Sequence, residues 1–253
     1  MFIRSRFVKI PGIMLFGPPG IGKGTFARLV AKDFNLFHIS PGSLLRKLVN
    51  DRDIQNDPKL EYIQLALQSH SLPREDITMD LIIREYEKNK SEYKGVIFDG
   101  FPRSKSYIPL MKEKFDLNKF VIVELILSEH ILMEKLLGRR ECSSCHRTYN
   151  LTNYVNEVYS IPAILPKIEE QCDECGGKLV QREDDSPKII QNRFKKYKTE
   201  TLELIKELEL EGLTKVSFEV KKGLDDYILI SKLIEEAIFK SGKIQTNSKL
   251  IHI

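Results

Sequence analysis

Short apolar runs alternate with amphipathic stretches along most of the 253 residues. The runs at residues 13–16, 95–98 and 120–127 are nearly all apolar and lie next to glycine, proline or acidic residues, which is typical of buried strands. A further strand is expected at residues 213–218. Such strands, separated by helical segments, predict an α/β fold with a doubly wound parallel sheet that helices cover on both faces.

The spacing of apolar residues between these strands predicts helices, with the apolar positions gathered on one face of each. They are expected at residues 23–33, 42–50, 58–69, 77–88, 129–137, 187–210 and 225–239. Between residues 141 and 181 the helical periodicity fades, and cysteines, prolines and paired glycines appear. We interpret that segment as a small inserted module, and the residues from 240 onward as a loose tail.

A glycine-rich loop follows the first predicted strand and precedes the first predicted helix. Its sequence, Gly-Pro-Pro-Gly-Ile-Gly-Lys at residues 17–23, fits the phosphate-loop pattern G-x-x-x-x-G-K in the structural context that the pattern requires. Glycines let successive backbone N–H groups face one point, and the helix N-terminus adds positive potential there. The strict pattern has Ser or Thr directly after the lysine, whereas here Gly24 follows Lys23 and Thr25 comes next.

Beginning with Lys23-Gly24-Thr25, the chain resembles the adenylate kinase family in five motifs that occur in order. The other four are Ser40-Pro41-Gly42 with Arg46, Asp99-Gly100-Phe101-Pro102-Arg103, Gly138-Arg139-Arg140, and Arg182-Glu183-Asp184-Asp185 with Arg193. The resemblance extends from about residue 13 to residue 239. It implies a P-loop NTPase-type core (residues 1–40, 74–138 and 182–253), an inserted helical region that binds the nucleoside monophosphate (41–73) and a zinc-binding lid (139–181).

The resemblance also implies a reaction, namely reversible Mg²⁺-dependent phosphoryl transfer from ATP or GTP to AMP. Such transfer depends on positioning and charge neutralisation, for which the planar fork of arginine is well suited. The implied catalytic residues are Lys23, Asp99, Arg103, Arg139, Arg182 and Arg193. The implied triphosphate site comprises Gly17, Gly20, Gly22, Lys23, Gly24, Thr25, Lys135 and Arg139. The implied AMP site comprises Ser40, Arg46, Leu72, Gly100, Arg103, Tyr107, Arg182 and Arg193.

Expectations for three acidic residues and one further arginine complete this set. The resemblance implies that Asp99 holds the water molecules of the magnesium ion. Asp99 also directly follows a predicted strand, the place where ligands of such folds bind. Asp184 and Asp185 are expected to orient the lid arginines or to follow the metal. Arg140 is expected to be a surface residue.

All four cysteines of the chain lie in the inserted module, as two C-x-x-C pairs. They are Cys142 with Cys145 and Cys172 with Cys175. A disulfide framework would scatter cysteines through the fold, so the pattern indicates a metal site in a reducing compartment. Four thiolates suit tetrahedral, structural Zn²⁺ with no open position. An iron centre and two local disulfides are the weaker alternatives, and His146 is expected to be a bystander.

Composition narrows the class of protein further. The chain is 42% hydrophobic and 30% charged, and no apolar run reaches the roughly 18 residues of a membrane span. A net charge of +4 suits anionic nucleotides but gives no clustered basic face for nucleic acid. A zinc-ribbon nucleic-acid binder is therefore disfavoured, and the resemblance implies a monomer. The basic start (residues 1–9) favours a short overhang over a mitochondrial presequence, so we expect a cytoplasmic protein, with the mitochondrion as the alternative.

Four positions depart from the family pattern. Pro41 and Ser43 replace the usual Thr and Asp, Lys135 replaces an arginine near the donor base, and Tyr107 replaces the glutamine that pairs with adenine. Tyrosine lacks the two-point contact that an amide makes with adenine. A kinase for UMP, CMP or GMP and a low-activity adenine-nucleotide sensor therefore stay open, although the retained charged residues favour an AMP kinase.

Overall fold

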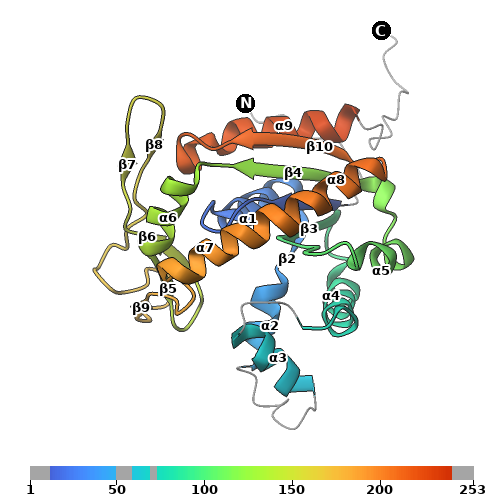
Figure 1. Cartoon of the computed structure of the whole chain (residues 1–253), viewed down its shortest axis with the longest axis horizontal. Helices are drawn as coiled ribbons and strands as arrows, with labels where there is room; N and C mark the ends of the chain where they lie inside the picture. Colours follow the sequence, from blue (N-terminus) through green and yellow to red (C-terminus); the bar gives the residue numbers. More distant parts are fainter. Residues whose placement is uncertain (1–11, 50–58, 69–72, 241–253) are drawn as a thin grey trace.

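The computed structural model describes residues 12–49, 59–68 and 73–240, and a five-stranded parallel sheet lies at its centre (Figure 1). The strand order is β10-β4-β1-β3-β2, and every neighbouring pair is parallel. The strands are β1 (Gly12–Phe16), β2 (Leu36–Ile39), β3 (Gly95–Asp99), β4 (Phe120–Ile126) and β10 (Thr214–Glu219). The α/β class and the parallel sheet predicted from the sequence are thus confirmed.

Helices cover both faces of the sheet, which explains why its central strands are mostly apolar, with Glu124 in β4 and Asp99 at the end of β3 as the exceptions. In β1, Ile13 and Leu15 face one cluster of buried residues, whereas Met14 and Phe16 face the other. Helices α1, α6, α7 and α9 pack on the first face, and α4, α5 and α8 on the second. The helices are α1 (Lys23–Phe34), α2 (Pro41–Val49), α3 (Lys59–Gln68), α4 (Glu75–Asn89), α5 (Tyr107–Lys114), α6 (Glu129–Leu137), α7 (Pro187–Lys196), α8 (Leu202–Leu210) and α9 (Tyr227–Lys240).

Three features of this core differ from the sequence-based expectation. Strand β2 and helix α5 are additional elements, both of them short. The long helix expected at residues 187–210 is divided by a π-helical turn, Tyr197–Thr201, between α7 and α8. The turn, Tyr-Lys-Thr-Glu-Thr, contains neither glycine nor proline, so the sequence gives no sign of a break there.

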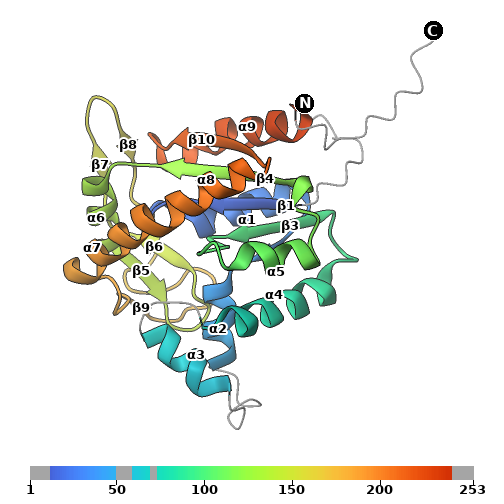
Figure 2. The ribbon, with the colours of Figure 1, turned by 45° about the vertical axis from the view of Figure 1, so that its right-hand side comes forward.

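Helices α2 and α3 project from the sheet beyond β2 (Figures 1 and 2). They pack together with α4 through a small separate cluster of Leu45, Ile63 and Ile77. Among the described residues, few apolar side chains of α2 and α3 pack against the main core. The region is therefore held to the sheet mainly through the chain segments that join it to the core.

The inserted module consists of two small antiparallel sheets. One has the order β6-β5-β9, with β5 (Arg139–Cys142), β6 (Thr148–Asn150) and β9 (Leu179–Val180); the other is the hairpin of β7 (Tyr154–Val155) and β8 (Ser160–Ile161). The buried cluster of the first sheet holds only Cys142, Tyr149, Cys172 and Leu179 among the described residues. So small a core is typical of a module that a bound metal stabilises.

The β7–β8 hairpin is fastened to the core. Ile161 is 1% exposed and belongs to the main buried cluster. The Ser160 N–H donates to the carbonyl of Lys221 over 2.8 Å, and the Tyr159 hydroxyl donates to Glu219 Oε1 over 2.7 Å. The module therefore contacts the core at two places, this hairpin and the end of α6.

Some sequence-based expectations lie outside the described residues. These are the basic start (residues 1–9), Leu72, the tail beyond residue 240, and the ends of the helices expected at 42–50 and 58–69. Within the described ranges, none of the helices has the length and apolar character that a membrane span requires.

Candidate active site

The glycine-rich loop joins the carboxyl end of β1 to the first turn of α1. Gly20 and Gly22 have φ angles of 88° and 99°, a left-handed region that glycine adopts without strain. A Cβ atom on Gly20 would also meet Leu136 Cγ at 2.8 Å. The N-terminus of α1 therefore opens onto the loop, and its N–H groups and dipole favour an anion there.

Lys23 closes over this loop. Its Nζ donates to the carbonyl oxygens of Gly17 and Pro18, over 2.7 and 3.0 Å. Desolvation, together with the smaller effects of Arg103, Arg193 and Arg139, lowers the pKa of Lys23 to about 7, although Asp99 opposes the shift. An amine with a pKa of about 7 is only partly protonated at neutral pH. An anionic ligand beside it favours the protonated, charged form.

Asp99 ends β3 directly beside the loop. Its Oδ2 atom lies 3.3 Å from the position that a Cβ on Gly24 would take, and 3.6 Å from His38 Nε2. Burial acts to raise the pKa of Asp99, but His38 and the charge of Lys23 outweigh it and hold the pKa below its ordinary value. Asp99 is therefore an anion at the mouth of the phosphate loop.

Carboxylates hold three arginines, namely those in β5, in the segment after β9 and in α7. Asp185, whose side chain is 0% exposed, accepts hydrogen bonds from Arg139 Nε and Nη2 over 2.7 and 2.6 Å. Arg193 Nη1 lies 3.1 Å from Asp184 Oδ2 and 3.3 Å from Asp185 Oδ1. Arg182 pairs with Glu141 through Nε and Nη2. Each guanidinium thus has a fixed direction before any ligand binds.

The start of α2 and the segment after β3 bring two more arginines together. A Cβ on Gly42 would lie 3.4 Å from Arg46 Nη1 and 3.9 Å from Arg103 Nη2, so only a small residue leaves both guanidinium groups room here. Arg103 Nε donates to the carbonyl of Gly100 over 3.3 Å. Burial lowers the pKa of Arg46, and the neighbouring charge of Arg182 adds to this.

Tyr107, at the start of α5, is buried to 3% exposure. Its ring packs edge-on against Phe101, with ring centroids 4.8 Å apart. Burial raises the pKa of Tyr107, and the side chain of Thr78 hydrogen-bonds to it. This tyrosine therefore forms a firm wall of the site, with its hydroxyl already engaged.

These groups line one pocket of about 540 Å³. Every predicted nucleotide-site residue that the structure describes is among the lining residues: Gly17, Gly20, Gly22, Lys23, Gly24, Thr25, Ser40, Arg46, Asp99, Gly100, Arg103, Tyr107, Lys135, Arg139, Arg182 and Arg193. Sequence reasoning missed further lining residues, namely His38, Glu75, His146 and Tyr149, and Lys196, Tyr197, Glu200 and Thr201 beside the π-helical turn. No motif marks them, because the fold alone brings them to the pocket.

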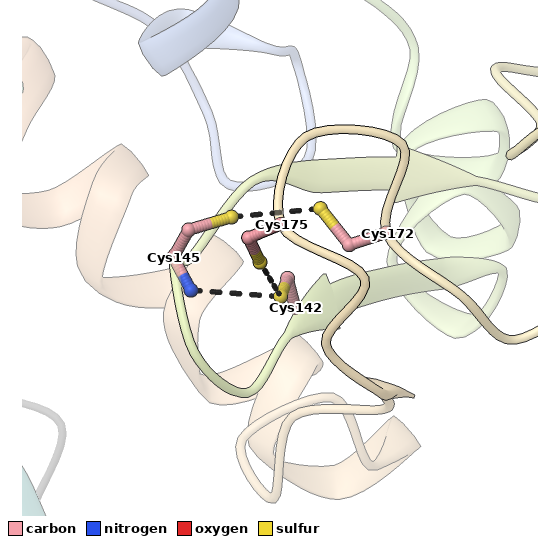
Figure 3. Close-up of side chains that lie close together, drawn as sticks. All are labelled: Cys142, Cys145, Cys172 and Cys175. Carbon is pink, nitrogen blue, oxygen red and sulfur yellow. Dashed lines mark hydrogen bonds between the residues drawn. The ribbon is translucent and has the colours of Figure 1, made fainter.

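The four cysteines come together at the turn after β5 and the turn before β9, and Figure 3 shows their side chains converging. Their sulfur atoms all lie within 4.8 Å of one another, and the thiols are free. Zinc–sulfur bonds of about 2.3 Å place ligand sulfurs about 3.8 Å apart, so the cluster is compatible with a bound zinc ion.

Hydrogen bonds to the sulfurs support the same interpretation. The N–H groups of Ser144 and Cys145 donate to Cys142 Sγ over 3.4 and 3.5 Å. Burial acts to raise the pKa of Cys172, but the Tyr149 hydroxyl and two backbone N–H groups lower it to about 6. Thiolates are the form that binds a metal. His146 stands apart from the four sulfurs and contacts Glu141 instead.

A phosphate loop at the carboxyl end of a parallel sheet, which shares its pocket with a set of arginines, defines a P-loop nucleotide-binding protein. The family model for adenylate kinase matches residues 15–212. The chain therefore belongs to the adenylate kinase family, as its motifs predicted.

Individual relatives agree with this assignment. The chain is 32% identical over 220 residues to the GTP:AMP phosphotransferase of Plasmodium falciparum, a match that covers 85% of this chain and 92% of the relative. It is 30% identical over 223 residues to an adenylate kinase of Caldanaerobacter subterraneus, covering 85% and 91% of the two chains. An adenylate kinase of a Thermoanaerobacter species is 29% identical over 235 residues, covering 91% and 99%.

Proposed function

We propose that the protein is a nucleoside monophosphate kinase, which transfers a phosphoryl group from ATP or GTP to AMP and gives two diphosphates. The observation that carries the proposal is the gathering of Lys23 and five arginines, from separate elements, around one pocket. Such a set is suited to the charge that spreads over the transferring group and its neighbours. Family membership supports the reaction, and the name of the Plasmodium relative supports GTP as a possible donor and AMP as acceptor.

The geometry supports a division of labour among these residues. Lys23 and the loop bind the terminal phosphates of the donor, while Arg46 and Arg103 bind the phosphate of the acceptor. Arg139, Arg182 and Arg193 neutralise the group in transit between the two. Lys135, which also lines the pocket, contacts the donor nucleoside.

Magnesium fits the oxygen ligands beside the phosphate loop. Asp99 supplies an ionised carboxylate, and Thr25 supplies a hydroxyl in the first turn of α1. Magnesium bound there with the nucleotide would supply charge neutralisation at the donor phosphates. Asp99 would hold the waters of the ion, and Lys23 would balance the carboxylate.

We further propose that residues 139–181 act as a lid whose fold depends on structural zinc at the four cysteines. Residues 41–73 form the acceptor region, and residues 1–40, 74–138 and 182–253 form the core. Closure of the lid excludes water from the phosphates and so prevents hydrolysis of the donor. The protein acts on nucleotides as a monomer in this proposal, in the cytoplasm or the mitochondrion.

A different acceptor base is the second candidate. Its support is Tyr107, which stands at the acceptor end of the pocket with its hydroxyl turned to Thr78. A ring at this position offers a base a stacking surface rather than a paired amide. UMP, CMP and GMP therefore belong in the same assay.

The test is a matrix of donors (ATP, GTP) against acceptors (AMP, GMP, UMP, CMP) with zinc-loaded protein and magnesium, and diphosphate formation as the readout. A Lys23→Met variant serves as the control for contaminating kinase. Turnover that requires AMP and Lys23 supports the proposal, whereas turnover only with another acceptor would show that the natural acceptor is not AMP. Nucleotide binding without turnover in any pair supports a sensor and contradicts the kinase.

A further inference from the structure

A carboxylate that no nucleotide-site motif includes lies between the cysteine cluster and the phosphate pocket. Glu141 occupies the third position of β5, directly before Cys142, and is 6% exposed. A buried carboxylate is costly unless strong partners compensate it. Its two oxygen atoms have different partners, one on each side of the strand.

The first partner is Arg182. The guanidinium donates its Nε hydrogen to Glu141 Oε2 over 2.6 Å, and its Nη2 also donates to Oε2. The remaining N–H groups, including both on Nη1, lie outside this pair. Since Arg182 lines the central pocket, these remaining groups are the ones available to a phosphate oxygen.

The second partner is His146, whose Nδ1 atom lies 3.2 Å from Glu141 Oε1. His146 has a φ angle of 60°, in the left-handed region that non-glycine residues rarely adopt. This conformation turns the imidazole back across the C-x-x-C turn to the carboxylate. Glu141 is thus held by His146, the residue directly after Cys145, while it holds Arg182.

The surroundings explain why Arg182 needs such a partner. Arg46, Arg139 and Arg193 line the same pocket, and like charges repel. Arg139 and Arg193 are held in place by Asp185 and Asp184. Glu141 gives Arg182 the same support.

We propose that Glu141 is a positioning residue for phosphoryl transfer: its carboxylate fixes the guanidinium of Arg182 toward the phosphates and connects that arginine to the cysteine cluster. This inference rests on the proposed kinase function. Glu141 itself touches no phosphate, and its whole effect on turnover passes through Arg182.

A double-mutant cycle on the full-length, zinc-loaded protein tests this. The variants are Glu141→Gln, Arg182→Ala and the double variant, with kcat, KM for each nucleotide, bound zinc and thermal midpoint measured for each. Glu174→Gln is the matched control, because Glu174 pairs with Arg147 over 3.1 Å in the same module and does not line the pocket.

We expect Glu141→Gln to lower kcat by about tenfold, because the amide oxygen can still accept from Arg182 but the charge that strengthens the pair is lost. Glu141→Gln should leave the zinc content unchanged. When it is combined with Arg182→Ala, the kcat of the double variant should equal that of Arg182→Ala alone. The Glu174→Gln control should retain wild-type kcat. Wild-type kcat in Glu141→Gln, or losses that multiply in the double variant, would overturn the proposal.

Two further measurements keep the outcome clear. If Glu141→Gln loses zinc, Glu141→Asp decides, because it keeps the charge and shortens the reach; unchanged kcat at full zinc content would refute the proposal. If the wild type itself shows no turnover, the kinase function fails, and the same cycle is measured on triphosphate affinity. Additive effects there would refute the coupling of Glu141 to Arg182 independently.

Discussion

Binding of a nucleoside triphosphate should draw a proton onto Lys23. With a pKa of about 7, this lysine is mostly neutral in the free protein above pH 7, against an ordinary value near 10.5. The phosphates of a bound nucleotide favour the charged form and raise the pKa again. Because the free state has lost the proton and the bound state has regained it, affinity must fall as the pH rises above about 7.

The size of the effect follows from the two states. At pH 8.5 a group with a pKa of about 7 is about 3% protonated, so binding takes up roughly one proton per nucleotide. The dissociation constant should then rise about tenfold per pH unit, or about 1.4 kcal/mol, between pH 7.5 and 9.5. The nucleotide does not contribute over this range, because the last phosphate pKa is near 6.

Isothermal titration calorimetry in two buffers of different ionisation enthalpy gives the proton count directly. Lys23→Met should bind more weakly, with uptake near zero at pH 8.5. Lys135→Met is measured in parallel, because burial lowers the pKa of Lys135 as well and makes this residue the second candidate for proton uptake. Absence of uptake in the wild type, or equal uptake in Lys23→Met, would refute the reasoning.

Three other substitutions give separate predictions. Asp185→Asn removes the charge that fixes Arg139 and should lower the free energy of unfolding by about 3 kcal/mol, as measured by urea denaturation; a loss below about 1 kcal/mol would contradict this. Cys172→Ser should abolish bound zinc and make residues 139–181 the first site of proteolysis, as metal analysis and mass spectrometry will show; full zinc content would argue against a four-thiolate site. Tyr107→Gln should lower the KM for AMP relative to that for GMP or CMP, and an unchanged ratio would exclude this residue from base selection.

The sequence predicted the core of the fold because its strands are buried on both faces. The run at β1 is apolar at every position and the run at β4 at every position but Glu124, and the glycine loop between β1 and α1 has a pattern typical of phosphate-binding loops. Strand β2 was missed because it has only four residues, of which the middle two are half-exposed. The packing of the sheet, rather than local propensity, makes this segment a strand.

The candidate site was predictable where chemistry fixes residue type at fixed spacing. Lys23, the arginines and the paired cysteines belong to such patterns, and the structure brings them together. The role inferred for Glu141 was not predictable, because its partners Arg182 and His146 are distant or unremarkable in sequence and meet only through the pairing of β5 with its neighbours. The π-helical turn at Tyr197–Thr201 likewise leaves no local signal.

The most direct test of the kinase function is to follow the γ-phosphoryl group itself. Zinc-loaded protein is mixed with magnesium, γ-labelled ATP or GTP, and AMP, and the labelled products are separated. We predict labelled ADP that forms with wild-type protein and not with Lys23→Met. Label that appears only as free phosphate, or that remains on the donor while both nucleotides bind, would contradict phosphoryl transfer as the function of this site.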